Sequence, residues 1–439
     1  MRRSKNIIIV AAVLLFSVLA LSSCSILDVS SMVGTGGGSS VSGKDYLTRE
    51  EVEAMISGIE ENVTVNAGDN YDITINSQND KNLLAASRGL LSAVSINCVF
   101  DVTVSYSSGF GRPAQTYTTQ KSSAGSGVIY QLDKEHGSAY IITNYHVVYC
   151  NGADTEDDIS DNIKVYLYGK EYTDYAIPAT YVGGSMNYDI AVLRVTNSDV
   201  LRESSAIAAT FADSNNISVL DTAIAIGNPE GRGISATVGA VNIESEELEM
   251  TSIDGKGVMS LRVMRTDAAV NGGNSGGGLF NDSGEVIGIV NAKLTDTDID
   301  NIGYAIPSNV ARYVADNIIY YDSLDEKNDA VYRLILGINV TVSEAKAELD
   351  TETGKVNRIE TVIVGSVVEG GIADGKLFAE DVIKSVTIDG VTHDIVRTYN
   401  VVDVMLGARV GSSVVFTVVR GGEQLDVTMD TANAQLTQY

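Results

Sequence analysis

Tryptophan is absent from this chain of 439 residues, and histidine and cysteine are scarce, with three of each. No CxxC pair and no HExxH sequence occurs, so the spacings of the common zinc sites are missing, and we expect neither a metal site nor a cofactor. Basic residues are also few: 30 Lys and Arg against 57 Asp and Glu give a formal net charge of −27. Because phosphate binding needs clustered positive charge, this balance argues against nucleic acid as a partner.

The N-terminal apolar run is too short for a typical membrane span. It covers residues 7–21 after the basic start MRRSKN, whereas a span needs about 20 residues. The run ends in LSSC, which resembles a bacterial lipobox, where Cys24 would be lipidated and become the mature N-terminus. We therefore expect a signal peptide at 1–23 and an extracytoplasmic protein attached to the membrane through Cys24. An uncleaved transmembrane anchor is the alternative. Outside the cytoplasm, Cys98 and Cys150 could form a disulfide. Two buried free thiols are an equal alternative.

Composition divides the rest of the chain into five parts. Gly and Ser dominate the start, which predicts a flexible tether at 24–45. Residues 46–89 are expected to form a helix (LTREEVEAMISGIEE) and a hairpin (VTVNAGDNYDITIN) of unknown role. A β-rich region follows at 90–321, then a charged linker at 322–330, and a last unit at 331–439.

Short β-branched segments separated by Gly, Asn and Asp turns fill the region from 90 to 306. Many short strands without alternating helices indicate a sandwich or barrel, and their number on each side of residue 215 permits two barrels. A helix is predicted to begin at Ser308. The last unit is expected to contain strands near 334–342, 359–367, 381–389 and 413–429, one helix at 398–408, and a hairpin turn at Gly421 and Gly422.

The segment VNGGNSGGGLF, residues 270–280, surrounds Ser275 with five glycines. A tight turn between strands would explain it. A nucleophilic serine would explain it too, because its flanking N–H groups could then face a developing negative charge. Serine needs a base, and histidine is the best one near neutral pH. His136 is expected on a polar surface turn and His393 in an exposed loop, which leaves His146, after the apolar strand AYIIT.

Asp189 opens the apolar strand of NYDIAVLRV, so we expect its carboxylate to be partly buried and to need a partner. His146 would be that partner, although an Asp in a turn before a strand is common. The chain order His146, Asp189, Ser275 is that of the chymotrypsin fold, in which His and Asp come from the first barrel and Ser from the second.

Five collinear segments resemble the HtrA/Deg family of serine proteases, over about residues 90–439. They are SGVIY…ITNYHVV, YDIAVLRV, AIAIGNPEG, TDAAVNGGNSGGGLFNDSGEVIGI and IGYAIPSNVA. The resemblance implies a mainly β chain, with a chymotrypsin-like double β-barrel protease domain followed by a PDZ domain at 331–439. It also implies ATP-independent cleavage of misfolded or regulatory proteins outside the cytoplasm, and homotrimers.

The resemblance assigns roles to particular residues. Ser275 would be the nucleophile, His146 the general base and Asp189 its orienting carboxylate, with backbone N–H groups of Gly273 and Ser275 forming the oxyanion hole. Segment 289–293, with Asn291, Ala292 and Lys293, would pair with the substrate backbone. The side-chain pocket would be lined by Gly303, Tyr304 and Ala305 and would favour apolar residues. In the PDZ unit, a peptide carboxylate would bind at Ile335, Leu336, Gly337 and Ile338.

Two departures from the family stand out. The lipobox takes the place of the usual signal anchor, and GNPEGRG carries Glu230 and Arg232 in a loop that is more often apolar. The sequence predicts a membrane-anchored serine endopeptidase. The alternative is an inactive binding or holdase protein that works through the PDZ groove.

Overall fold

A computed structural model describes residues 63–67, 71–75, 78–106, 115–170, 174–295, 302–324, 330–351 and 354–439. The predicted signal peptide, Cys24, the tether and the predicted helix near residues 47–61 lie outside these residues. Within them, no helix is both long and apolar enough to cross a membrane.

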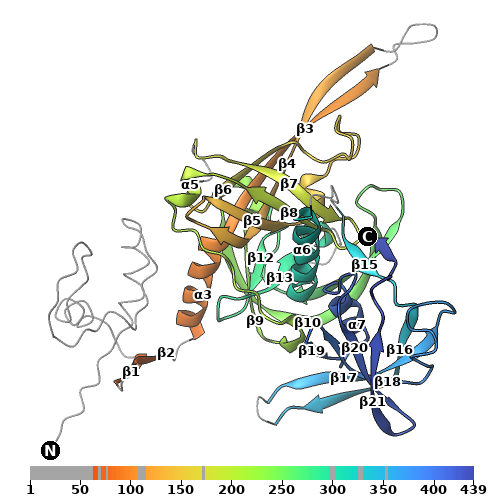
Figure 1. Cartoon of the computed structure of the whole chain (residues 1–439). Helices are drawn as coiled ribbons and strands as arrows, with labels where there is room; N and C mark the ends of the chain where they lie inside the picture. Colours follow the sequence, from red (N-terminus) through yellow and green to blue (C-terminus); the bar gives the residue numbers. More distant parts are fainter. Residues whose placement is uncertain are drawn as a thin grey trace, which may run out of the picture.

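Two closed six-stranded barrels form the centre of the molecule (Figure 1). The first barrel has the strand order β3-β4-β5-β8-β7-β6. Its strands are β3 (Ala93–Tyr106), β4 (Gln115–Asp133), β5 (Ser138–Thr143), β6 (Asn162–Leu167), β7 (Ile177–Ser185) and β8 (Ile190–Val195). The second barrel has the order β10-β11-β14-β13-β12-β9. Its strands are β9 (Thr222–Gly227), β10 (Ser235–Thr251), β11 (Val258–Thr266), β12 (Gly278–Phe280), β13 (Val286–Val290) and β14 (Gly303–Pro307).

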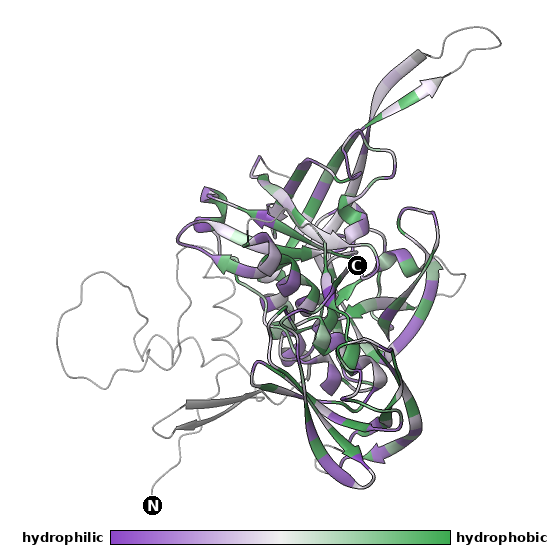
Figure 2. Cartoon of the chain, turned by 45° about the vertical axis from the view of Figure 1, so that its right-hand side comes forward, coloured by the Kyte–Doolittle hydropathy of each residue, from purple (hydrophilic) through white to green (hydrophobic). Residues whose placement is uncertain are grey.

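Each barrel closes around apolar side chains. Strand β8 is buried along nearly its whole length, as are β12, β13 and β14 of the second barrel. Figure 2 shows hydrophobic residues concentrated in the middle of the molecule. Cys98 lies inside the first barrel and Cys150 is half-buried, and both are free thiols, so the disulfide alternative is not what the structure has. The predicted double barrel is confirmed, because alternating short strands without intervening helices have few other ways to bury one face.

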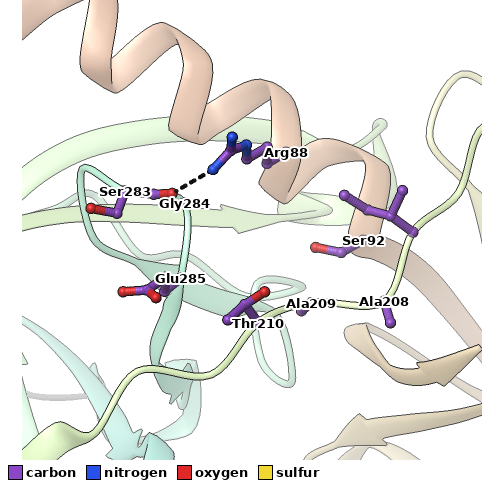
Figure 3. Close-up of a pocket in the computed structure, with 9 residues that line it drawn as sticks. Arg88, Ser92, Ala208, Ala209, Thr210, Ser283, Gly284 and Glu285 are labelled. Carbon is purple, nitrogen blue, oxygen red and sulfur yellow. Dashed lines mark hydrogen bonds between the residues drawn. The ribbon is translucent and has the colours of Figure 1, made fainter. Parts of the chain in front are cut away.

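Helix α3 (Gln78–Ser92) precedes the first barrel and is not among the predicted elements. It packs against the second barrel, where Ala85 joins the core and Arg88 Nη1 donates a hydrogen bond to the Ser283 carbonyl, 3.2 Å away (Figure 3). A small cavity of about 180 Å³ lies between the helix, segment 207–210 and the turn at 283–285. The hairpin before α3 is formed as predicted, by β1 (Val63–Ala67) and β2 (Tyr71–Ile75).

Helix α6 (Ser308–Asp322) begins at the predicted residue and connects both barrels to the last unit. Val310, Ala311, Val314 and Ile318 lie on one face and are buried in the main core. The helix packs against β7 and β8 of the first barrel and against β13 of the second. It therefore anchors the last unit, which follows it in the chain, to the two barrels.

The last unit is a sheet of order β16-β17-β18-β20-β21 with β19 added to β18. Its strands are β16 (Ile338–Leu349), β17 (Val356–Val367), β18 (Val382–Ile388), β19 (Val391–Asp394), β20 (Val414–Arg420) and β21 (Glu423–Met429). Helix α7 (Thr398–Met405) packs beside β16. The β20–β21 turn at Gly421 and Gly422 is confirmed.

The first and last strands of this unit form a separate two-stranded sheet. β15 (Tyr332–Leu334) pairs with β22 (Leu436–Gln438), so the predicted strand near 334–342 is interrupted after Leu334. Asn317 on α6, which has no exposed surface, donates to the carbonyl oxygens of Tyr332 and Leu406 and accepts from the Tyr332 N–H. One amide thus joins the unit to α6 at two points.

Candidate active site

His146 lies in the short helix α4 (Tyr145–Val148), directly after strand β5. Tyr145, Val147 and Val148 are buried and fix the helix against the first barrel, which leaves His146 on the opposite side with 16% of its side chain exposed. Its Nδ1 lies 2.7 Å from Oδ2 of Asp189, and its backbone N–H donates to Oδ1 of the same carboxylate at 3.0 Å. The carboxylate therefore sets the ring so that Nδ1 carries the proton and Nε2 is free to accept one.

Asp189 occupies the turn between β7 and β8 and has no exposed surface. Asn291 Nδ2 donates to its Oδ2 at 2.7 Å, in addition to the two bonds from His146. Its backbone is in the left-handed region, with a φ of 47°, and its carbonyl oxygen accepts a bond from Asn144 Nδ2 at 2.8 Å. A buried carboxylate is costly unless donors surround it, and here they come from both barrels.

Ser275 sits in the turn between β11 and β12, against the first barrel. Its carbonyl oxygen accepts a bond from the Ser126 N–H at 2.8 Å, and its Oγ accepts one from the Ala292 N–H at 3.1 Å. Gly276 follows with a φ of 85°, and a Cβ there would lie 2.2 Å from Ser126 O and 2.3 Å from Thr143 Oγ1. Only a residue without a side chain allows the turn to approach so closely. The serine is thereby packed beside the segment that leads into α4.

The backbone before Ser275 presents two N–H groups without acceptors. Gly273 has a φ of 96°, and the carbonyl of Gly272 accepts a bond from the Glu230 N–H at 2.8 Å. Because the peptide is trans, the Gly273 N–H points to the side away from Glu230. Among the described residues, nothing accepts a hydrogen bond from the N–H of Gly273 or of Ser275. Two neighbouring free N–H groups are the requirement for binding an oxyanion.

The loop that supports this turn is held by Asn228. Its backbone N–H donates to Ser126 Oγ at 2.8 Å, its Nδ2 donates to Ser95 Oγ at 2.6 Å, and its Oδ1 accepts from the Gly233 N–H at 2.7 Å. Glu230 and Arg232, the two charged residues noted in the sequence, form an exposed ion pair at 3.1 Å. Their side chains face solvent, whereas the backbone of Glu230 supports the turn.

The residues predicted to bind substrate are arranged differently from the prediction of an extended strand at 289–293. Strand β13 ends at Val290, and Ala292–Thr295 forms a 3-10 helix, with Ala292 buried and Lys293 exposed. The Asn291 side chain is turned inward to Asp189, so it is not free to contact substrate. The reason lies in the hydrogen bonds: the Ala292 N–H is directed to Ser275 Oγ, which ends the strand.

The predicted pocket residues Gly303, Tyr304 and Ala305 begin strand β14, and all three are buried. The Tyr304 carbonyl accepts a bond from the Asn291 N–H at 2.8 Å, which connects this strand to the Asp189 neighbourhood.

The predicted carboxylate-binding residues of the last unit form the turn between β15 and β16. Ile335 is 44% exposed and Leu336 is buried. Gly337 has a φ of 76°, and Ile338 begins β16, an edge strand of its sheet. Within the described residues, the N–H groups of Leu336 and Gly337 have no acceptor.

The two other histidines lie away from this site. His136 is exposed and paired with Asp133, as expected of a surface turn. His393 is not in an exposed loop: it lies on β19, half-buried against Tyr313 of α6. Burial lowers its pKa. No group of three or more His, Cys, Asp or Glu in the described part of the chain could hold a metal ion.

Sequence reasoning missed three supporting residues: Asn144, Ser126 and the inward role of Asn291. Each is a small polar residue of a type that is common in turns. Their partners lie at least 17 positions away, so local pattern carries no signal for them.

Comparison with known proteins agrees with this geometry. Residues 125–289 match the trypsin-like peptidase domain. The chain is similar to the serine protease Do-like HtrA of Lactococcus lactis subsp. cremoris (strain MG1363), with 29% identity over 82% of this chain and 85% of the relative. It is 30% identical to the serine protease Do-like HtrA of Lactobacillus helveticus, over 70% of this chain and 67% of that relative. It is 31% identical to the periplasmic serine endoprotease DegP of Escherichia coli (strain K12), over 72% of this chain and 58% of that relative. On these likenesses the chain belongs to the HtrA/Deg family of trypsin-like serine endopeptidases.

Proposed function

We propose that this protein cleaves misfolded or regulatory proteins outside the cytoplasm, with Ser275 as nucleophile, His146 as general base and Asp189 as its partner. The supporting observation is the 2.7 Å contact between His146 Nδ1 and Asp189 Oδ2, in which the carboxylate is fully buried. An imidazole that is oriented by a buried carboxylate, together with a serine in a glycine-rich turn packed beside the segment leading into α4, suits acyl transfer better than a structural role.

In the proposed reaction, His146 Nε2 takes the proton of Ser275 Oγ while that oxygen attacks the scissile carbonyl carbon. Asp189 accepts from the Nδ1–H and stabilises the imidazolium that forms. The N–H groups of Gly273 and Ser275 hold the oxyanion, each contributing ~3 kcal/mol. His146 then gives the proton to the leaving amine. Water hydrolyses the acyl-enzyme with His146 again acting first as base and then as acid.

The test is a Ser275→Ala variant in a casein digestion with the full chain. We expect no cleavage, and a loss of about 1–3 kcal/mol in unfolding free energy, because the variant removes the hydroxyl oxygen that accepts a hydrogen bond from the buried Ala292 N–H. A matched Ser283→Ala variant, in the turn between β12 and β13, should digest casein normally. Cleavage by Ser275→Ala at the parental rate would remove Ser275 from the mechanism.

We further propose that residues 331–439 are a PDZ domain that binds peptide C-termini. Two features support this: the acceptor-free N–H groups of Leu336 and Gly337, and the open edge of β16 beside α7. A bound peptide would add a strand to β16 while its carboxylate sits in the turn. Calorimetry on the full-length Ser275→Ala variant, with a peptide and its C-terminally amidated twin, tests this. Equal affinity for both peptides would contradict it.

The location and assembly complete the proposal: lipidated Cys24 attaches the protein to the membrane, and three copies associate. The LSSC sequence after a short apolar run supports lipidation of Cys24, and membership of the family supports the association of three copies. Fatty-acid labelling that is lost in Cys24→Ser supports lipidation, whereas equal labelling supports an uncleaved anchor. Sedimentation of the detergent-solubilised protein measures the number of copies.

A further inference from the structure

Tyr188 directly precedes Asp189 in the chain, yet its side chain contacts the last unit. Arg333 Nη1 donates to Tyr188 Oη at 3.1 Å. The rings of Tyr188 and Tyr439 have their centroids 6.3 Å apart, and the Arg333 guanidinium lies over the Tyr439 ring at 4.4 Å. Burial raises the pKa of the Tyr188 hydroxyl, so the oxygen stays a neutral partner for Arg333. Three side chains from two parts of the fold thus form one stack.

The two residues that hold Tyr188 are themselves fixed. Arg333 lies in the middle of β15, paired with Thr437 of β22, and the Tyr439 N–H donates to Val331 O at 2.9 Å. Val331 has no exposed surface and belongs to the core that the second barrel shares with α6. The β15–β22 pair is therefore a rigid support, and its position is tied to α6.

Asp189 needs such support more than an ordinary residue does. Its φ of 47° is unfavourable for a residue with a side chain. Its backbone is held by a 3.2 Å bond from its N–H to Met186 O and by the bond from Asn144 to its carbonyl. Because Tyr188 and Asp189 share a peptide bond, a displacement of Tyr188 that shifts its backbone also shifts the backbone that carries the Asp189 carboxylate. Strained backbone at an active site persists where the surroundings determine it.

We propose that Tyr188 is a positioning residue for Asp189, held in place by Arg333 and Tyr439. The last unit then takes part in the reaction without touching substrate at the catalytic centre, because its β15–β22 pair sets the orientation of the carboxylate. This inference rests on the proposed role of Asp189. A stack that merely stabilises the fold would change thermal stability and leave the chemistry of Ser275 unaltered, so the two roles can be separated.

The experiment compares Tyr188→Phe, Arg333→Met, Arg333→Lys and the double variant Tyr188→Phe/Arg333→Met in the full chain. The control is Lys355→Met, which breaks another contact between the barrels and the last unit, the 2.8 Å ion pair with Asp221, far in the chain from Asp189. Two rates are measured well below the melting temperature: cleavage of a short chromogenic peptide, and labelling of Ser275 by a small fluorophosphonate. Neither probe requires the peptide groove of the last unit.

We expect kcat and the labelling rate to fall about 3- to 10-fold in Tyr188→Phe and in Arg333→Met with KM unchanged, because a small misplacement of a catalytic group is costly. The double variant should be no slower than the slower single variant, Arg333→Lys should recover part of the rate, and Lys355→Met should match the parent. Parental rates in both single variants would overturn the inference, as would an equal loss in Lys355→Met. Labelling of Ser275→Ala at the parental rate would instead refute the proposed function.

Discussion

Asn291 offers a sharp test of how the buried carboxylate is held. Its Nδ2 lies 2.7 Å from Asp189 Oδ2, and neither residue has exposed surface. In Asn291→Leu, which keeps the branched shape of the side chain without its polar atoms, one charge-assisted hydrogen bond is lost in a site that water does not reach, worth about 1.5–3 kcal/mol. In the proposed mechanism, Asp189 is most needed when His146 becomes positively charged, so most of this loss should fall on the transition state. We expect kcat to fall about 10- to 100-fold, since each 1.36 kcal/mol is a factor of ten.

Stability should respond less than activity. The Oδ1 atom of Asn291 is buried and accepts no hydrogen bond from the described residues, so the parent already carries an unpaired acceptor that leucine removes. Removing it offsets part of the lost bond to Asp189, since an unpaired buried polar group costs about 1–3 kcal/mol. The net change in unfolding free energy should therefore stay below about 2 kcal/mol.

The assay is hydrolysis of a short chromogenic peptide, alongside chemical unfolding of each variant. Asn291→Ser, which keeps a donor near the carboxylate, serves as the matched control and should recover part of the lost rate. If Asn291→Leu is folded and its kcat lies within twofold of the parent, then the bond to Asp189 does not contribute to catalysis and the reasoning fails.

Three further predictions concern packing and charge. Gly276→Ala should abolish activity and lower stability by about 2 kcal/mol or more, because its Cβ would lie 2.2 Å from a backbone oxygen of β4; activity and chemical unfolding check this. Asn317→Leu should lower the unfolding free energy by about 2–4 kcal/mol, because it removes three hydrogen bonds between α6 and backbone groups of Tyr332 and Leu406, and proteolysis between α6 and β15 should accelerate. Burial alone would raise the pKa of Asp381, but its paired hydrogen bonds to Arg420 lower it below the ordinary value. Because the folded-state pKa is lowered, the contact stabilises the fold above about pH 4, and this stabilisation is lost as the pH falls through the folded-state pKa. Arg420→Met should therefore destabilise the protein at pH 7, by about 2 kcal/mol, and progressively less below pH 4 in unfolding titrations.

Much of the architecture could be predicted from the sequence because it depends on short-range pattern. Alternating apolar strands indicate barrels, an apolar stripe from Ser308 indicates α6, and paired glycines indicate the β20–β21 turn. Helix α3 was missed, since polar residues interrupt its apolar ones. Its stabilising contacts come from the second barrel, whose first strand in the chain, β9, begins only at residue 222.

The candidate site divides in the same way. Ser275, His146 and Asp189 could be proposed because each residue type stands out in its local setting and the order of the three is informative. Their supports could not, because Asn291 lies 102 positions from Asp189 and Arg333 lies 145 positions from Tyr188. Nothing in either neighbourhood specifies such a partner until the barrels close and β15 pairs with β22. The 3-10 helix at Ala292–Thr295 also depends on a long-range bond, to Ser275 Oγ.

The pairing of β15 with β22 has a consequence for protein engineering. The first and last strands of this unit, β15 and β22, lie side by side, an arrangement that normally makes a unit easy to exchange for another. Here the exchange point matters, because Val331 belongs to the core of the barrels and Arg333 reaches the neighbour of Asp189. A chimaera joined after α6 would replace both residues along with the proposed peptide-binding groove. A chimaera that keeps β15 and β22, and exchanges what lies between them, would change the ligand while leaving the catalytic half intact.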